Sequence, residues 1–139
     1  MKGSKGSQIV VDMPFEQYES YMKNRLKFWV KSLGLQMFTI VLNLDVEDKE
    51  VGGQGRVDTN NVGRSARIDI VDREWYKKEG FIVAQDPEVT LVHELLHIVS
   101  HQLEETHLLP GTLAFELHHQ ILSDQAKLLV ALSRGCRSV

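Results

Sequence analysis

Residues 86–99 read DPEVTLVHELLHIV, and the rest of the predicted domain can be built outward from them. Asp86 is a common helix N-cap, and Pro87 suits the first helical position, where a missing N–H leaves no hydrogen bond unmade. Apolar residues then recur so often that they cover most of the helix circumference, which is typical of a buried helix. We therefore expect a helix from about Pro87 to Glu105, with the remaining elements packed around it.

Upstream of this helix, the sequence predicts one helix followed by strands. Residues 15–32 carry apolar side chains at helical spacing. Residues 36–44 and 65–71 alternate apolar and polar side chains, as strands with one buried face do. The charged, glycine-rich residues 45–61 between them are expected to form a loop or a hairpin, and residues 73–78 a short helical turn.

Downstream of it, residues 112–133 carry apolar side chains on one stripe and predict a last helix. The order of helix, strands, helix and helix indicates an α+β domain with a short twisted sheet. A chain of 139 residues fits one such domain. We expect residues 15–139 to form it, and residues 1–14 to be a flexible lead-in.

Composition and charge limit the classes of function. The net charge is −3 and the pI is near 6.1, whereas a dedicated nucleic-acid binder would be basic, so we expect no nucleic-acid partner. The single cysteine, Cys136, cannot form an internal disulfide and suits a reducing compartment. No apolar segment is long enough to span a bilayer, and the first residues do not resemble a signal peptide, so we expect a cytoplasmic protein without a membrane partner.

Residues 93–97 read HELLH, which places two histidines four residues apart on one helix face. Side chains at this spacing reach the same metal ion, and neutral imidazole is a good zinc ligand. A histidine pair on a buried helix also needs partners for its ring nitrogens, and a metal supplies them. The pattern therefore predicts a zinc site on His93 and His97.

The residue that follows the first histidine suggests the chemistry of this site. Zinc lowers the pKa of a bound water to about 7 and polarises a substrate carbonyl. Glu94 projects beside the ion, where it can take the proton of that water and deliver it to the leaving amine. A purely structural zinc site has no use for a base at this position, so Glu94 favours catalysis.

A catalytic zinc site usually has three protein ligands, so the third must come from outside the HELLH segment. We expect Glu116, early in the last helix, to fold back and supply it. His118 and His119 are alternatives as ligands, and either is also a candidate for stabilising an oxyanion. Asp124 is a candidate for orienting a ligand histidine through its other ring nitrogen.

Three further residues lie too far along the predicted helix to complete the site. His101 continues the series of histidines four residues apart, but three in one straight helical row rise too far to surround one ion. Glu104 and Glu105 lie still further along the same helix and meet the same objection. The third ligand is therefore expected from a different element.

The stretch EVTLVHELLHI at residues 88–98, followed by Glu116 on a second helix, resembles the gluzincin branch of the zincin metallopeptidases. The layout from residue 15 to residue 132 is similar to the small, minimal HExxH metallopeptidases of phages and prophages. The resemblance implies zinc on His93, His97 and Glu116, with Glu94 as general base. It also implies a zincin-like fold, in which the active-site helix packs under a small sheet whose edge strand receives the substrate, in a bacterial host or phage-infected cell.

Several zincin patterns are absent from this chain. The thermolysin-like pattern has an aspartate four residues after the glutamate ligand, where this chain has Gln120. The metzincin extension needs a glycine and a third histidine, but Ser100 and Leu103 stand there. The bacterial rRNA-maturation endonucleases would also have a histidine in place of Leu103, and the zinc-ribbon cysteines of many SprT-like proteases are missing.

The leading interpretation is a zinc-dependent metallopeptidase that hydrolyses bonds in a peptide or protein substrate through a zinc-activated water. The alternative is a zinc-containing binding or structural domain without turnover, which the small size of the chain allows. A metal-dependent nuclease is a third hypothesis, which the acidic balance and the missing histidine at Leu103 disfavour.

Overall fold

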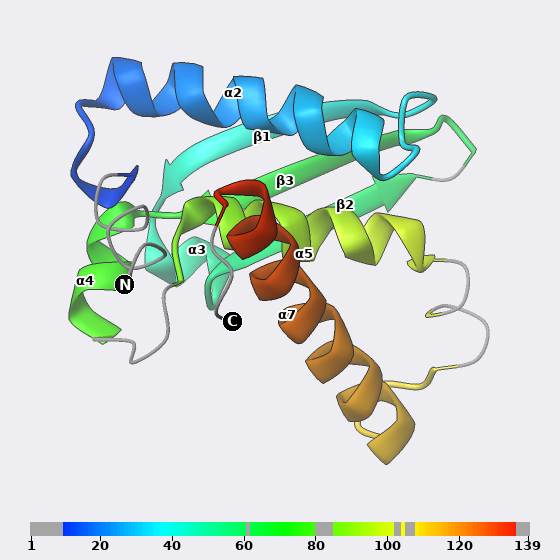
Figure 1. The fold of residues 1–139 in the computed structure, drawn as a ribbon. Coiled ribbons are helices and arrows are strands. Elements are labelled where there is room, and N and C mark those ends of the chain that lie inside the picture. Colours follow the sequence, from blue (N-terminus) through cyan, green and yellow to red (C-terminus); the bar gives the residue numbers. More distant parts are fainter. Residues whose placement is uncertain (1–9, 61, 80–84, 102–103, 105–107, 136–139) are drawn as a thin grey trace.

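One mixed sheet and the helices that pack on it make up most of the described chain (Figure 1). The structure, a computed structural model, describes residues 10–60, 62–79, 85–101, 104 and 108–135. The α+β class predicted from the sequence is confirmed. Within the described ranges, no helix combines the length and the apolar character that crossing a bilayer requires.

The strands of the sheet have the order β1-β3-β2, with β3 (Ser65–Val71) in the centre. β1 (Thr39–Val46) runs parallel to β3, and β2 (Gly55–Asn60) runs antiparallel to it. The segment predicted to be a loop or a hairpin therefore contains β2 and also the short helix α3 (Asp48–Val51). In the described part of the chain, β2 pairs with β3 alone and is an edge strand.

Two helices cover one face of the sheet. α2 (Phe15–Ser32) and α5 (Pro87–Val99) contribute to one hydrophobic core with the sheet, and α5 lies beside β2 and β3 (Figure 1). Because successive strand residues point to opposite faces, Ala66, Ile68 and Ile70 of β3 are all buried on this side. Apolar packing thus fixes α5 against the sheet.

The N-terminus of α5 has the cap that the sequence predicts. The side chain of Asp86 accepts hydrogen bonds from the backbone N–H groups of Glu88 and Val89, at 3.0 and 3.2 Å. These two N–H groups have no partner inside the helix, so the Asp86 side chain replaces the missing acceptors.

The C-terminus of α5 lies earlier than predicted. The helix ends at Val99 with Ser100 as its C-cap, and Ser100 Oγ donates to the backbone carbonyl of Leu96 at 3.0 Å. The expectation of one continuous helix to Glu105 is therefore wrong beyond Val99. A serine side chain that bonds to the carbonyl four residues earlier competes with the helical pattern, which favours an end at this point.

α7 (Leu113–Ser133) is the predicted last helix, and it crosses α5 (Figure 1). Its buried residues Leu122, Ala126 and Val130 are four residues apart and belong to the core shared with α5. This buried stripe sets the rotation of α7 about its own axis. It thereby decides which polar side chains of α7 point towards α5.

The flexible lead-in predicted over residues 1–14 ends too late. Val10 is buried at 2% exposure and Met13 packs against the main core, because both bring apolar surface to it. Val11 packs against a second small cluster that includes Tyr76 of α4 (Arg73–Glu79), the predicted helical turn. The rest of the predicted lead-in, residues 1–9, lies outside the described part of the chain.

Candidate metal centre

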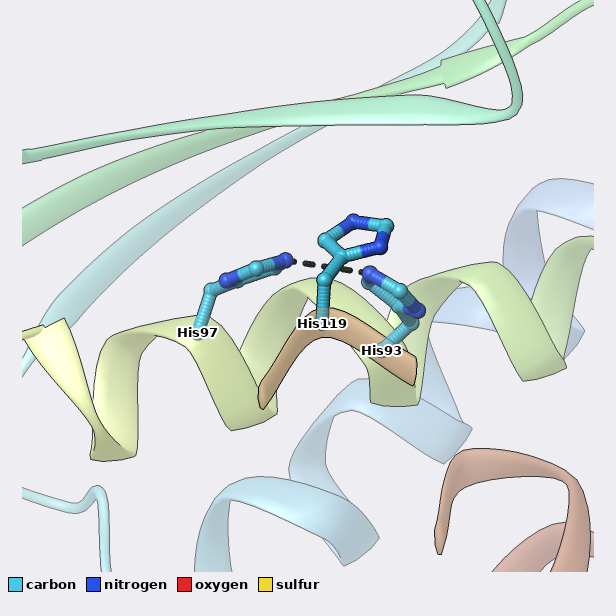
Figure 2. Close-up of side chains that lie close together, drawn as sticks. All are labelled: His93, His97 and His119. Atoms are coloured by element: carbon cyan, nitrogen blue, oxygen red, sulfur yellow. Dashed lines mark hydrogen bonds between the residues drawn. The ribbon is translucent and has the colours of Figure 1, made fainter. Parts of the chain in front are cut away.

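Three imidazole rings come together where α7 crosses α5 (Figure 2). His93 and His97 lie on one face of α5, and His119 comes from α7. One nitrogen from each ring can be chosen so that all three lie within 4.8 Å of one another, and Nε2 of His93 is 3.0 Å from Nε2 of His97. We call these three residues the histidine cluster.

The nitrogen atoms of the histidine cluster fit a zinc ion. Zinc–nitrogen distances of about 2.0–2.1 Å place two ligand nitrogens of a tetrahedral site about 3.3 Å apart. The Nε2 atoms of His93 and His97 are 3.0 Å apart, close to that value, and a nitrogen of His119 lies within 4.8 Å of both. Imidazole is a ligand that zinc prefers, and three protein ligands are the usual number in catalytic zinc sites.

Burial keeps the two histidines of α5 neutral, as metal ligands must be. Burial is the main reason why the pKa of His93 is lowered to about 3, and the charges of the other two cluster histidines and of Lys127 act in the same direction. The pKa of His97 is also lowered by burial, although its hydrogen bond to Glu104 opposes this shift. A neutral imidazole offers a lone pair to a metal where a protonated one cannot.

Glu104 orients the ring of His97. Both of its carboxylate oxygens lie 3.0 Å from His97 Nδ1, and an ionised carboxylate can only accept, so we assign the proton to Nδ1. The lone pair of the neutral ring is then on Nε2, the atom that faces His93. Burial acts to raise the pKa of Glu104, but hydrogen bonds from Ser100 and His97 outweigh it, so the pKa is lowered and the carboxylate stays ionised.

Glu94 lies beside the histidine cluster and is 7% exposed. Burial raises the pKa of Glu94 to about 8, and the negative charge of Glu104 acts in the same direction. A carboxyl group in this environment takes up and releases a proton near neutral pH. General acid–base catalysis at that pH needs a group with this property.

Gly55 allows β2 to approach α5 at the level of Glu94. A Cβ atom at this position would lie 2.6 Å from Cγ2 of Thr90 and 3.4 Å from Cγ of Glu94. Thr90 is buried and its hydroxyl group is hydrogen-bonded to Tyr76, so its side chain cannot easily turn away. Glycine is therefore needed here for space, because a larger residue would push the edge strand away from Glu94.

Two cavities flank the histidine cluster and share Gly55, Glu94 and His119 in their walls. The larger cavity, about 490 Å³, also borders His93 and extends towards Lys127 of α7. The smaller cavity, about 350 Å³, borders the other α5 histidine and extends along β2. The two cavities thus lie next to each other along the cluster, with these three residues between them.

The structure brings His119, and not Glu116, to the α5 histidines. At about 100° per residue, His119 lies about 60° around α7 from the buried Leu122, whereas Glu116 lies about 120° from it. Glu116 is accordingly exposed and does not belong to the cluster of ligand atoms. The expected fold-back of Glu116 is not observed, and His119, weighed as an alternative, lies there instead.

The other residues predicted near the site take different positions. His118 Nε2 lies 3.1 Å from Glu104 Oε2 and 3.2 Å from Ser100 Oγ, so this ring ties α7 to the segment after α5. Asp124 is exposed and accepts a hydrogen bond from Gln120 Nε2 at 3.0 Å. The contact with a cluster histidine that was expected of Asp124 is made by Glu104.

Three residues of the site were not expected from the sequence in their present roles: Gly55, Glu104 and Ser123. Ser123 Oγ lies 3.2 Å from His93 Nδ1, and its position four residues after His119 was a signal that both share a helix face. Glu104 reaches His97 only because α5 ends early. The close approach of Gly55 to α5 depends on β2, a strand that the local sequence does not indicate. Neither of these two had a local signal.

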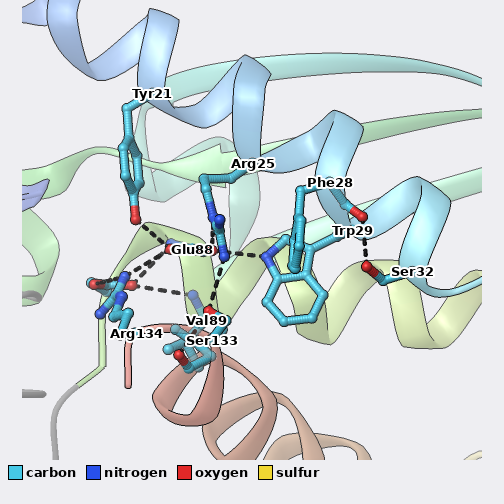
Figure 3. A network of polar contacts seen from close by, with 11 residues as sticks. Tyr21, Arg25, Phe28, Trp29, Ser32, Glu88, Val89, Ser133 and Arg134 are labelled. Atoms are coloured by element: carbon cyan, nitrogen blue, oxygen red, sulfur yellow. Dashed lines mark hydrogen bonds and ion pairs between the residues drawn. The ribbon is translucent and has the colours of Figure 1, made fainter. Parts of the chain in front are cut away.

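At its N-terminal end, α5 carries a different kind of polar group (Figure 3). Glu88 is fully buried and accepts hydrogen bonds from Tyr21 Oη, Arg25 Nε and Trp29 Nε1 at 2.5, 2.5 and 2.8 Å. Burial acts to raise the pKa of Glu88, but these donors outweigh it and the pKa is lowered. These three donors are side chains of α2, so the contacts fix α2 to α5.

Arg134, the C-cap of α7, joins the same group. Its Nη2 atom lies 3.0 Å from Glu88 Oε1 and 2.6 Å from Asp86 Oδ2. Asp86 Oδ2 has no aligned hydrogen-bond donor among the described residues, and Arg134 is its ion-pair partner. We call Tyr21, Arg25, Trp29, Glu88 and Arg134 the Glu88 network.

Comparison of the chain with models of protein families, with curated proteins and with solved structures finds no match.

Proposed function

We propose that this chain is a zinc-dependent hydrolase that cleaves peptide bonds. The observation that supports this most strongly is the histidine cluster, whose three ligand atoms lie within 4.8 Å of one another beside the buried Glu94. His93, His97 and His119 would hold the ion, and the cavities on both sides leave room for a fourth, exchangeable ligand. A zinc site with a structural role alone would close that position with a protein ligand.

The residues around the cluster have separate tasks in this reaction. Zinc, when bound, supplies a Lewis acid that lowers the pKa of water and polarises a carbonyl oxygen. Glu94 accepts the proton of the attacking water on its carboxylate and passes it to the nitrogen of the leaving amine. Glu104 holds His97 in the tautomer whose Nε2 lone pair faces the cluster.

The edge strand β2 is suited to hold an extended peptide. Gly55, Val57 and Thr59 of β2 line the smaller cavity next to the cluster. An extended peptide can add to a sheet edge through backbone hydrogen bonds, while alternate side chains enter pockets. Because Gly55 brings this edge close to Glu94, the peptide bond that passes Glu94 would be the one that is cleaved.

Two measurements on one purified protein test this function. Elemental analysis after purification without chelator should find about one zinc per chain. A quenched-fluorescence peptide mixture should be hydrolysed by the wild type, while Glu94→Gln keeps the zinc and loses about 10²-fold or more of the activity. Glu116→Gln removes an exposed carboxylate of the same type and should change neither quantity.

The outcomes separate the competing functions. A protein that takes up no zinc, even when zinc is added back, contradicts a zinc-dependent hydrolase. A protein that binds zinc and cleaves no peptide would be a zinc-containing binding domain. Full activity in Glu94→Gln would refute the role given to that carboxylate.

A further inference from the structure

The two cavities beside the histidine cluster differ in charge. Both share Glu94, but beyond it the larger cavity carries Lys127 in its wall, whereas the smaller cavity carries Glu104. Glu104 is already engaged by His97 and Ser100. Lys127 is half-buried and forms no ion pair with any residue that the structure describes. The larger cavity thus contains a cation that no described carboxylate pairs with.

Neutral polar groups, rather than further acids, complete the wall near Lys127. Gln85, Gln120 and Ser123 line the same cavity. Gln85 Oε1 accepts a hydrogen bond from Gln54 Nε2 at 2.9 Å, which directs the Gln85 amide into a fixed position with its N–H groups still available. Groups of this kind donate hydrogen bonds to an anion and do not repel it.

The position of Lys127 on α7 sets the distance between its ammonium group and the histidine cluster. It lies eight residues after His119 on α7, a rise of about 12 Å, and helical side chains tilt towards the helix N-terminus. Lys127 lines the same cavity as His93 and His119, and the length of the lysine side chain covers part of this separation. One or two residues of extended peptide, at about 3.3 Å each, span what remains.

We propose that the larger cavity is a subsite for a carboxylate of the substrate, bound by Lys127 and positioned one or two residues from the scissile bond. This proposal rests on the proposed function, because the subsite lies beside the same histidine cluster and would determine which class of peptide is cleaved. A half-buried ammonium group has lost some of its hydrogen bonds to water. A carboxylate replaces them with charge-assisted hydrogen bonds. The acidic side chain of aspartate or glutamate and the C-terminal carboxylate of a peptide both offer this chemistry.

Binding of short peptide hydroxamates to the zinc-loaded wild-type protein tests the subsite. The hydroxamate anchors the probe on the metal, and aspartate, asparagine or lysine is placed one or two residues away. A second pair of probes carries a free C-terminal carboxylate or its amide at the same positions, which distinguishes the two sources of the anion. We expect the preferred carboxylate probe to bind about tenfold more tightly than its neutral counterpart.

Substitutions at Lys127 should abolish or reverse this preference. In Lys127→Gln, the carboxylate and amide probes should bind equally, and in Lys127→Glu the lysine probe should bind best. Lys23→Gln is the matched control, because Lys23 is an exposed lysine on α2 that pairs with Glu19 and lies outside the cavity wall. It should keep the tenfold preference.

The results distinguish failure of the subsite from failure of the proposed function. Equal binding of charged and neutral probes by the wild type, or an unchanged preference in Lys127→Gln, overturns the carboxylate subsite. If peptides are hydrolysed without any preference for acid, the subsite alone is wrong. If the probes bind with the expected preference and no peptide is cleaved, the subsite stands and the hydrolase function falls.

Discussion

The two ends of α5 carry buried polar groups of opposite character. At the N-terminal end, the Glu88 carboxylate is surrounded by donors from α2 and α7, and its partners all belong to the chain. Two turns later, the Nε2 atoms of His93 and His97 face each other at 3.0 Å, with the ring of His119 close by. The Glu88 carboxylate thus has protein donors on both of its oxygens, whereas the second group brings three ring nitrogens within 4.8 Å of one another.

This difference distinguishes residues that stabilise the fold from residues that are available to bind a ligand. A buried charge with a full set of partners is costly to disturb and has nothing left to offer a ligand. Glu104 and Ser123 contact the outer ring nitrogens of His97 and His93, and the inner nitrogens of these two rings face each other. Stability and metal binding should therefore respond to different substitutions.

Glu88→Ala should have the largest effect on the free energy of unfolding. It removes the acceptor from the Glu88 network and leaves the half-buried guanidinium of Arg134 paired with Asp86 alone. Breaking a buried ion pair from one side costs about 3–5 kcal/mol. Urea unfolding monitored by circular dichroism measures the loss. Glu19→Ala, which removes an exposed ion pair with Lys23, should cost less than about 1 kcal/mol.

His119→Ala should show the converse pattern. Losing one of three ligands should weaken zinc binding by about 10²-fold or more, while the free energy of unfolding of the zinc-free protein changes little. Competition with a chromophoric chelator measures the affinity. Glu116→Ala, three residues earlier on the same helix, should leave the affinity unchanged. A large loss in Glu116→Ala instead would mean that α7 presents a different face to α5.

Glu104→Gln should have a smaller effect on the same quantity. The amide keeps the shape of the side chain but no longer offers two ionised oxygens to His97 Nδ1, so the ring loses part of its orientation. Substitutions of such outer partners typically cost about 10–100-fold in metal affinity. An affinity equal to that of the wild type would show that Glu104 does not orient this ligand.

The pH dependence of stability should differ between the wild type and Glu88→Gln. The pKa of Glu88 is lowered in the folded protein, so its contribution is present above the ordinary value of 4.5 and is lost as the pH falls through the lowered value. The wild type should therefore lose more free energy of unfolding than Glu88→Gln as the pH falls from neutral to below the ordinary value of 4.5. Parallel curves for the two proteins in acid titrations would contradict this assignment.

The elements that could be predicted are those with a strong local pattern. The bounds of α2 and of β3 match the predicted ranges, and Asp86 and Pro87 mark the start of α5. β2 lies in a segment that was predicted only as a loop or a hairpin, because glycine, aspartate and asparagine are poor strand formers; its pairing with β3 overrides that propensity. A strand that is stabilised mainly by tertiary contacts is therefore difficult to predict from its own residues.

The site was predictable to the extent that it lies within one turn of one helix. His93, Glu94 and His97 follow from helical spacing alone. The choice between Glu116 and His119 depends on how α7 is rotated and where it crosses α5, and the buried stripe of α7 sets both. The contact between Glu104 and His97 depends on the end of α5 at Val99, which the apolar pattern does not mark.

The most direct test of the account is X-ray absorption spectroscopy of the zinc-loaded protein at the zinc edge. The account predicts about one zinc per chain with three imidazole ligands and one light-atom ligand from solvent. Two imidazoles with a carboxylate would restore Glu116 as the third ligand and contradict the placement of His119. Protein that cannot be loaded with zinc at all would reduce the histidine cluster to a packing feature of α5 and α7.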